Sequence, residues 1–355
     1  MPDAFARFRH DFDARRITLV SNWRSHEDLV RVQHIIAQRI DPQSEQPEAR
    51  AARSVNGDIA AIWEYQTDDQ EAAGLAEWIA TEIQNGIDPH EIAILARLRV
   101  NEVEESLAAF LLEHGVRLRN IARNVGEISI QDLLAEELTA VLVPLLRLGA
   151  SSRDPVAWNR AQRSMLFLEG VYPDDESAQQ RVQQRLQDFV RALRSNMSAT
   201  APSGAAAKVI ANLALAFLGA SNLRRAMPAY RRRQDFDRVW EGFATLLAES
   251  SEGAVTWTDA LNQFEGHGQV ALMTIHKSKG LEFHTIIFYG LDNQTWWSLT
   301  PDRVEELNSF FVALTRAQQR AFFTLCMGRG QPVAWIENLL APAGVRRING
   351  PPGHG

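Results

Sequence analysis

The stretch from Val270 to Cys326 constrains the fold more than any other part of the chain. Two short apolar runs, Val270–Thr274 and His284–Tyr289, have the length and composition of buried strands. Between Glu305 and Ala317 the apolar residues recur at helical spacing, and a third apolar run, Ala321–Cys326, follows. This strand–loop–strand–helix–strand order predicts an α/β fold built on an open sheet.

Polar residues stand where the predicted strands and helix end. Thr274 and His276 follow the first strand, and Arg316 lies at the terminus of the helix. Ligands of open α/β sheets bind at the carboxyl ends of the strands. We therefore expect a site there for a ligand that needs a cation and a few hydrogen-bond donors. The alternative is an ordinary α/β core whose loops happen to be polar.

Strand and helix patterns also alternate between Gly57 and Leu118, with strands at Gly57–Tyr65 and Ile92–Ala96. We expect this segment to share one parallel sheet with Val270–Cys326. From Ser129 to Val270 the pattern changes, and helices follow one another almost without strands. The expected helices are Ser129–Leu148, Asp154–Phe167, Ser177–Ser195, Ala205–Leu218 and Asp235–Glu249.

These patterns predict four segments. Residues 1–128 and 267–342 should form the two parts of one α/β domain, and residues 129–266 an all-helical insertion into it. Residues 343–355, which end in GPPGHG, should form a disordered tail.

Composition excludes several classes of protein. A single cysteine, Cys326, excludes a disulfide framework and any multi-cysteine metal site, which fits a reducing cytoplasm. No apolar stretch approaches the ~20 residues that a membrane span needs, so no membrane association is expected. The formal net charge of −7 argues against a protein that coats nucleic acid, but it allows a local basic track.

Five arginines lie close together in the helical segment. Either they form a solvated helix face, which is the more common situation, or they form a patch that contacts phosphates. They are Arg224, Arg225, Arg231, Arg232 and Arg233.

Three short motifs resemble those of the UvrD/Rep/PcrA-like superfamily 1 helicases. TIHKSKGLEF and VALTRA, at Thr274–Phe283 and Val312–Ala317, resemble motifs V and VI in the family's order and separation. NWRS, at Asn22–Ser25, resembles motif IV, with Trp23 in place of the usual tyrosine. The resemblance implies the second RecA-like domain of such a helicase. This is a parallel-sheet domain of the P-loop NTPase fold that lacks the P-loop half and is interrupted by a helical insertion.

The resemblance also assigns a nucleotide site. It implies that Arg24 and Arg316 are catalytic and reach the γ-phosphate of ATP, bound with Mg²⁺ between two RecA-like domains. Arginine suits this role because its forked, permanent cation matches phosphate oxygens. Gly280 and Glu282 would lie by the nucleotide, with Glu282 accepting a hydrogen bond from a ribose hydroxyl. The two arginines should lie near each other and near Glu282, which could otherwise be an ordinary surface carboxylate.

Four residues of the same motif are implied to contact DNA. Thr274 and His276 would face single-stranded DNA, and both suit hydrogen bonding to its backbone without base readout. Lys277 and Lys279 would add phosphate affinity. His276 could instead be a packed loop histidine, and the lysines could simply be solvated.

A tryptophan pair, Trp296 and Trp297, lies in a loop that differs from the family's usual longer, acidic loop. The pair could stack on bases. The favoured alternative is that it covers the sheet edge or meets a further domain.

The chain has no G-x-x-x-x-G-K-[ST] and no acidic pair placed to hold Mg²⁺, so no metal ligand is expected. We therefore predict the C-terminal motor half of an ATP-dependent 3′-to-5′ DNA helicase, cytoplasmic and catalytically incomplete alone. Its expected partners are single-stranded or partly duplex DNA and an N-terminal ATPase half, and the resemblance implies a role in DNA repair. The alternative is a non-catalytic module that binds DNA or a partner chain, or a subunit that acts in trans on a separate ATPase.

Overall fold

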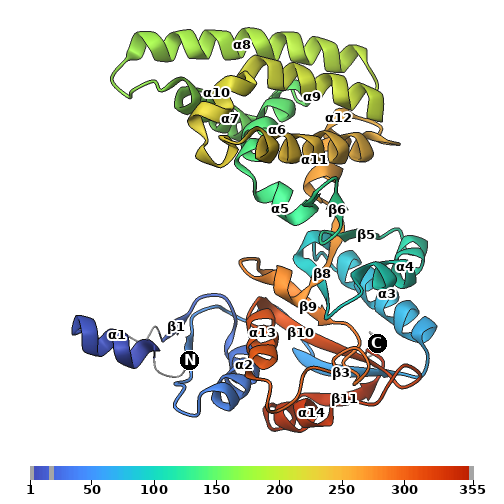
Figure 1. Ribbon diagram of the computed structural model, residues 1–355. Helices are drawn as coiled ribbons and strands as arrows, with labels where there is room; N and C mark the ends of the chain where they lie inside the picture. The colour runs from blue at the N-terminus through green and yellow to red at the C-terminus, as the bar shows by residue number, and fades with distance from the viewer. Residues whose placement is uncertain (1–3, 16–19, 352–355) are drawn as a thin grey trace. The chain divides into compact units, whose positions relative to one another are not determined.

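The computed structural model describes residues 4–15 and 20–351. The chain divides into two compact units. The first combines Met1–Leu75 with Ser278–Gly355, and the second is Ala76–Lys277. The first unit therefore combines the two ends of the sequence, drawn in blue and in orange to red in Figure 1, whereas the second is one continuous segment.

The first unit is built on four parallel strands, hydrogen-bonded in the order β11-β3-β10-β9 (Figure 1). The strands are β3 (Ala60–Tyr65), β9 (Phe283–Phe288), β10 (Ala317–Cys326) and β11 (Arg346–Asn349). Every residue of β9 is buried, which fits the apolar run Ile286–Phe288 at its end. Its Phe288 packs against Phe310, Phe323 and Trp296 to form an aromatic core.

Helices complete the first unit. They are α1 (Ala4–Phe12), α2 (Glu27–Ile40), α13 (Val304–Leu314) and α14 (Ala334–Leu340), with the first turns of α3 (Asp68–Gln84). Helix α2 packs against α13, α14 and β10. Its fully buried Leu29, Val32 and Ile36 form the face that the spacing of apolar residues predicts. A short parallel pair, β1 (Ser21–Asn22) and β2 (Glu48–Ala49), lies beside this helix in sequence.

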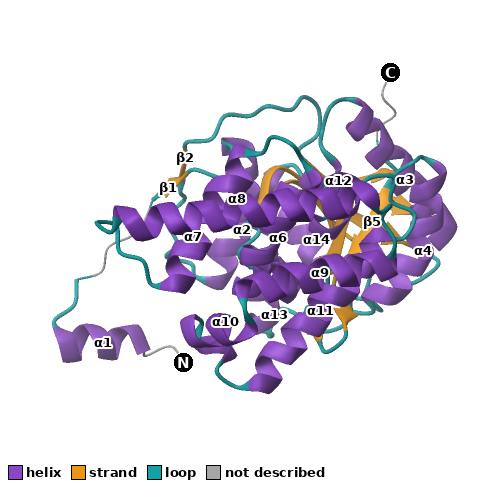
Figure 2. Ribbon diagram, turned by 90° about the horizontal axis from the view of Figure 1, so that it is seen from above, coloured by secondary structure: helices purple, strands orange, loops and turns teal. Residues whose placement is uncertain are grey.

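The second unit contains three parallel strands in the order β4-β8-β5 and a set of helices. The strands are β4 (Ile92–Ala96), β5 (Arg117–Asn120) and β8 (Gln269–Thr274), and α4 (Val100–Glu113) packs beside β5 and β8. From residue 130 to 265 the unit is drawn only as helix and loop in Figure 2. The α-helices of this range are α5 (Ile130–Ala135), α6 (Glu137–Ala150), α7 (Pro155–Glu169), α8 (Glu176–Ala199), α9 (Gly204–Leu218), α10 (Ala220–Ala226), α11 (Arg233–Ser251) and α12 (Trp257–Glu265).

The structure confirms the predicted class, an α/β fold with parallel strands. In the first unit β3 pairs with β10, and in the second β4 and β5 both pair with β8. Strands from Gly57–Leu118 therefore pair with strands from Val270–Cys326, as expected. The run predicted as one helix, Ser129–Leu148, is broken at Glu136, where the backbone is extended.

The border of each unit differs from the expected domain division. The units meet in sequence at 75/76 and 277/278, whereas the sequence pattern placed the borders at 128/129 and 266/267. The strands β4, β5 and β8 therefore group with the helices that they adjoin in sequence. The expected domain division remains a prediction.

The prediction of a disordered tail at 343–355 is wrong for the part that forms a strand. Arg346–Asn349 hydrogen-bonds in parallel to β3 as strand β11. Arg347 also bridges Glu337, by a contact from its Nη2, and Glu64, at 3.2 Å from Nη1. These backbone and charge contacts order a segment whose sequence has no apolar run. Residues 352–355 lie outside the described part of the chain.

A buried ionic cluster joins the carboxyl ends of β3, β9 and β10. Arg329, just after β10, donates to Asp68, Glu71 and Asp292 at 2.7 Å each. The carboxylates of Glu71 and Asp292 are fully buried. Burial alone would lower the pKa of Arg329, but its bonds to Glu71 and Asp292 raise that pKa above its ordinary value. The cluster therefore stabilises this edge of the sheet, and we call its members the ionic lock: Arg329, Asp68, Glu71 and Asp292.

Replacing Arg329 with glutamine should lower the free energy of unfolding by about 3–5 kcal/mol, because two buried carboxylates lose their cation. Urea denaturation followed by circular dichroism measures the change. The control is Arg50→Gln, since Arg50 and Glu48 also pair at 2.7 Å but with side chains 43% and 60% exposed. That change should cost less than about 1 kcal/mol. Equal effects of the two substitutions would contradict the lock.

Candidate functional site

Three of the residues predicted for a nucleotide site come together in the first unit. Arg24 lies between β1 and α2, Glu282 directly precedes β9, and Arg316 directly precedes β10. The guanidinium of Arg24 forms an ion pair with Glu282, and its Nη1 donates to the carbonyl of Thr315 at 3.2 Å. Segments almost three hundred residues apart in sequence thus form one cluster.

Buried hydrogen bonds tie the turn that carries Arg24 to the start of β10. The Ser25 hydroxyl donates to the carbonyl of Ala317 at 2.7 Å, and the His26 ring lies 2.9 Å from the carbonyl of Gln319. The amide of Gln33 donates to the carbonyl of Leu314 at 3.2 Å. Because Ser25 and His26 are almost fully buried, these bonds fix where Arg24 stands relative to Arg316.

The turn itself is closed by Asn22. Its side-chain oxygen accepts hydrogen bonds from the backbone N–H groups of Arg24 and Ser25, at 2.9 and 3.0 Å. Asparagine favours such turns because its side chain can replace a backbone acceptor. The Asn-x-Arg-Ser sequence thus has a local structural reason as well as a functional one.

The cluster carries more positive than negative charge. Burial and the neighbouring Arg24 both lower the pKa of Arg316, whereas Glu282 raises it. The hydrogen bond from Arg24 lowers the pKa of Glu282, so this carboxylate stays ionised. Two arginines and one glutamate leave a net charge of +1. The Nε of Arg24 is buried with no hydrogen-bond partner in the described residues. An anion with several acceptor oxygens fits this arrangement.

The cluster lies at the amino ends of β9 and β10, so the expectation that Arg316 marks a carboxyl edge is wrong. Strand β10 begins at Ala317, four residues before the apolar run predicted from sequence. Its first residues, Ala317–Arg320, extend the pairing with β9 at an irregular register. Arg316 therefore leads into a strand. Thr274, the last residue of β8, and His276, in the turn that follows it, stand at a carboxyl end as expected.

The residues predicted to contact DNA follow β8. The Thr274 hydroxyl accepts from the backbone N–H of Lys277 at 3.3 Å, which closes the single 3₁₀ turn Ile275–Ser278. His276 is exposed, which argues against a packed loop histidine, and Lys279 is exposed too. Lys277 is half-buried and paired with Asp132 at 2.7 Å, so it is not simply solvated.

Gly280 is exposed and has φ +89°, a conformation that favours glycine. Thr274, His276 and Lys277 belong to the second unit, whereas Lys279 and Gly280 belong to the first.

The tryptophans singled out in the sequence differ in exposure. Trp23 is 77% exposed and precedes Arg24 in sequence, so it presents a flat apolar face to solvent. The only sequence signal for Trp23 was its place in the NWRS motif. Trp296 is buried, and its indole N–H donates to the carbonyl of Tyr289 at 3.3 Å. Trp297 is 57% exposed and lies under Arg303, so the tryptophan pair does not act as one unit.

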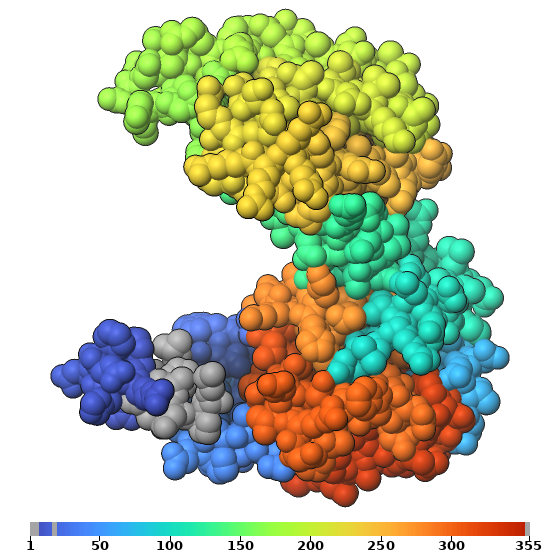
Figure 3. Space-filling model, in the orientation of Figure 1, coloured from blue at the N-terminus to red at the C-terminus, as the bar shows by residue number. Residues whose placement is uncertain are grey.

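The five clustered arginines lie on α10, on the turn after it and at the start of α11. Figure 3 shows this segment, in yellow, at the surface of the second unit. No aspartate or glutamate occurs between residues 189 and 234. Arg233 pairs with Asp237, and Arg225 donates to Asn222. Both interpretations of the cluster, a solvated face and a phosphate-contacting patch, are compatible with this exposure.

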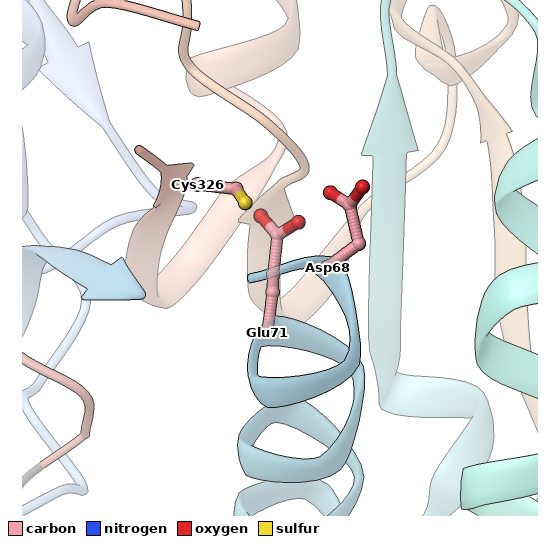
Figure 4. Close-up of side chains that lie close together, drawn as sticks. All are labelled: Asp68, Glu71 and Cys326. Atoms are coloured by element: carbon pink, nitrogen blue, oxygen red, sulfur yellow. The ribbon is translucent and has the colours of Figure 1, made fainter. Parts of the chain in front are cut away.

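One group of side chains has the spacing of a metal site. Asp68 and Glu71 on α3 point toward Cys326, and their ligand atoms lie within 4.8 Å of one another (Figure 4). Both carboxylates already accept hydrogen bonds from Arg329. Burial raises the pKa of the Cys326 thiol, so it stays protonated at neutral pH. The group therefore serves the ionic lock, and we assign no metal to it.

Among the described residues no single helix is long and apolar enough to cross a bilayer, whereas α9 and α10, a bent pair, together have the length and composition of such a span.

Comparison with known proteins points to one family. The model of the UvrD-like helicase C-terminal domain matches residues 174–328. The ATP-dependent DNA helicase Rep of Escherichia coli is 42% identical over 69 residues, which are 18% of this chain and 10% of Rep. Rep of Buchnera aphidicola, from Acyrthosiphon pisum, is 41% identical over 73 residues, 19% of this chain and 11% of that protein.

A longer match extends along almost the whole chain. The putative ATP-dependent DNA helicase YjcD of Bacillus subtilis is 24% identical over 369 aligned residues. The match covers 96% of this chain and 48% of YjcD. The chain therefore spans about half the length of YjcD and about a tenth of the length of Rep in these matches.

Glu282→Gln should reduce stability at neutral pH by up to about 1 kcal/mol, because the pair with Arg24 is partly exposed. The folded-state pKa of Glu282 is lowered, so its stabilisation is complete above the unfolded pKa. It should disappear as the pH falls through the folded pKa. Urea denaturation of both proteins from neutral to acid pH measures the difference. In an Arg24→Gln background the difference should vanish, and its persistence there would contradict this pairing.

Proposed function

Because the chain carries the C-terminal region of a UvrD/Rep-like superfamily 1 helicase, we propose that it is the C-terminal motor half of an ATP-dependent DNA helicase that moves 3′ to 5′. The observation that carries the proposal is the cluster of Arg24, Glu282 and Arg316. It unites residues from three motifs, one of which is far from the other two in sequence, and leaves an excess positive charge. The direction of movement rests on the family resemblance alone.

The cluster would supply the protein groups on only one side of a bound ATP. ATP with Mg²⁺, when bound, would supply the phosphoryl group to be cleaved and the metal that neutralises its oxygens. Arg24 and Arg316 would bind the γ-phosphate oxygens, and the buried Nε of Arg24 offers an unused donor for them. Glu282 would release Arg24 and accept from the ribose, beside Gly280. Trp23 would provide a stacking face for the base, which its 77% exposure allows.

The DNA contacts would come from the turn after β8. His276 is exposed in this turn, which the bond between Thr274 and Lys277 closes, and the exposed Lys279 follows it. Hydroxyl, imidazole and ammonium groups bind the phosphodiester backbone without reading bases, which suits movement along any sequence. Glu282 of the nucleotide cluster and the DNA turn lie within the same ten residues, Thr274 to Phe283, and this closeness in sequence would couple hydrolysis to movement.

The phosphate loop and the metal ligands would come from an N-terminal ATPase half of the same protein or from a separate subunit. This chain contains no phosphate-loop sequence. An arginine that stabilises the γ-phosphate contributes to the rate only when the phosphates are cradled from the other side. The chain alone would therefore be catalytically incomplete.

The 355-residue chain, mixed with single-stranded DNA and Mg²⁺-ATP, should show only background phosphate release, because no lysine of a phosphate loop is present. A coupled phosphate-release assay measures this. DNA-stimulated turnover that is lost in Arg316→Ala would contradict the expectation and would mean that the chain holds a complete site.

Joined to an ATPase half that carries a phosphate loop, the chain should support DNA-stimulated hydrolysis. Arg24→Ala or Arg316→Ala should then lower kcat by about 10³-fold or more, with little change in DNA affinity. The control is Arg31→Ala on α2, whose exposed guanidinium pairs with Glu27 and Asp28. A loss of DNA affinity as large as the loss of turnover would contradict the assignment of the two arginines to the nucleotide.

A further inference from the structure

Lys277, one of the four residues proposed to bind DNA, is held by the start of α5. Its Nζ lies 2.7 Å from Oδ2 of Asp132 and 3.3 Å from the Ser129 hydroxyl. The side-chain amide of Gln131 donates to the backbone carbonyl of Lys277. All four residues belong to the second unit. We call Ser129, Gln131 and Asp132 the clamp.

The contact between the clamp and Lys277 can open. The side chain of Lys277 is 35% exposed and that of Asp132 is 56% exposed, so solvent and solutes reach both. Exposed ion pairs of this kind are weak and are screened by salt. A phosphate could therefore replace the carboxylate as the partner of Lys277.

Asp132 does not depend on Lys277 for its hydrogen bonds. It is the third residue of α5, and the hydroxyl of the N-cap residue Ser129 donates to its Oδ2 at 2.5 Å. The same hydroxyl accepts from the backbone N–H of Asp132 at 3.2 Å. The hydrogen bond from Lys277 is the largest cause that lowers the pKa of Asp132, but the Ser129 hydroxyl and the charge of Arg238 lower it as well. The helix start would thus remain closed when Lys277 leaves.

We propose that Asp132 and a phosphate of single-stranded DNA compete for Lys277, so that the clamp is an autoinhibitory contact on the DNA-binding turn. This inference rests on the proposed function. Binding of DNA would move the ammonium group from the carboxylate to the phosphate and release the turn from α5. The clamp would then weaken DNA binding, whereas a clamp that only positions Lys277 would strengthen it.

The two roles predict opposite signs for Asp132→Asn. Under competition the variant gains one full phosphate contact, which adds ~0.7 to the steepness of the plot of log affinity against log salt. Its affinity should therefore be about fivefold higher at ~0.1 M salt and should approach that of the wild type toward ~1 M. The measurement is fluorescence anisotropy of a labelled oligothymidylate with the full 355-residue chain over this salt range. Adding Lys277→Ala to the variant should abolish the gain.

Asp259→Asn is a matched control. Asp259 is also the third residue of a helix, α12, and bonds to the N-cap hydroxyl of Thr256 at 2.8 Å. Asp259→Asn removes the same charge as Asp132→Asn, but no lysine contacts Asp259 among residues 4–15 and 20–351. Its affinity should change less than twofold. Asp132→Ser supplies a second neutral variant in case Asp132→Asn does not fold, as judged by circular dichroism.

The outcomes separate this inference from the proposed function. Tighter binding by both Asp132 variants, but not by Asp259→Asn, supports competition. Unchanged or weaker binding by folded Asp132 variants overturns it, as does an equal gain in Asp259→Asn. If the wild-type chain binds no oligothymidylate at any salt, the DNA role proposed above fails first, and competition fails with it.

Discussion

Strand β10 is the element on which the rest of the first unit depends. It pairs in parallel with β3 over six residues and with β9 on its other side, so it joins the early and late parts of the sequence. Its first residues also receive the hydrogen bonds of the turn at Asn22–His26. A parallel pair needs a long crossover, and here the crossovers contain the functional segments. Arg316 directly precedes β10, and the turn that carries Arg24 bonds to the first residues of β10. This strand therefore positions both arginines of the cluster.

The opposite ends of the same strand carry different kinds of ionic group. At the carboxyl end, Arg329 is 20% exposed and bonds to two fully buried carboxylates. At the amino end, Arg24 and Glu282 are 29% and 43% exposed. Breaking a buried group costs about 3–5 kcal/mol, whereas an exposed pair contributes about 0–1 kcal/mol. The first group is therefore structural, and the second can exchange its partner for a ligand.

The fold could largely be predicted because apolar runs mark the buried strands β4, β8 and β9. The sequence could not reveal β11, since Arg346–Asn349 has no apolar pattern and is a strand only because β3 offers an edge. Nor could it place the start of β10, where polar residues such as Gln318 continue the strand. The motifs predicted that Arg24, Glu282 and Arg316 would meet. Their ion pairing, and the different burial of Trp296 and Trp297, depend on neighbours distant in sequence.

The clamp on Lys277 follows the same physical logic as the pair of Arg24 and Glu282. In each case a cation proposed to bind phosphate is held by a carboxylate that is about half exposed. A bare cation would repel its basic neighbours, and a buried pair would be too stable to open. A half-exposed carboxylate avoids both the repulsion and the excessive stability. It neutralises the cation at little cost in free energy, and a phosphate, which offers more acceptor oxygens, can replace it. Asp132 lies 145 residues from Lys277 in sequence, so only the folded chain shows that the two proposed sites share this device.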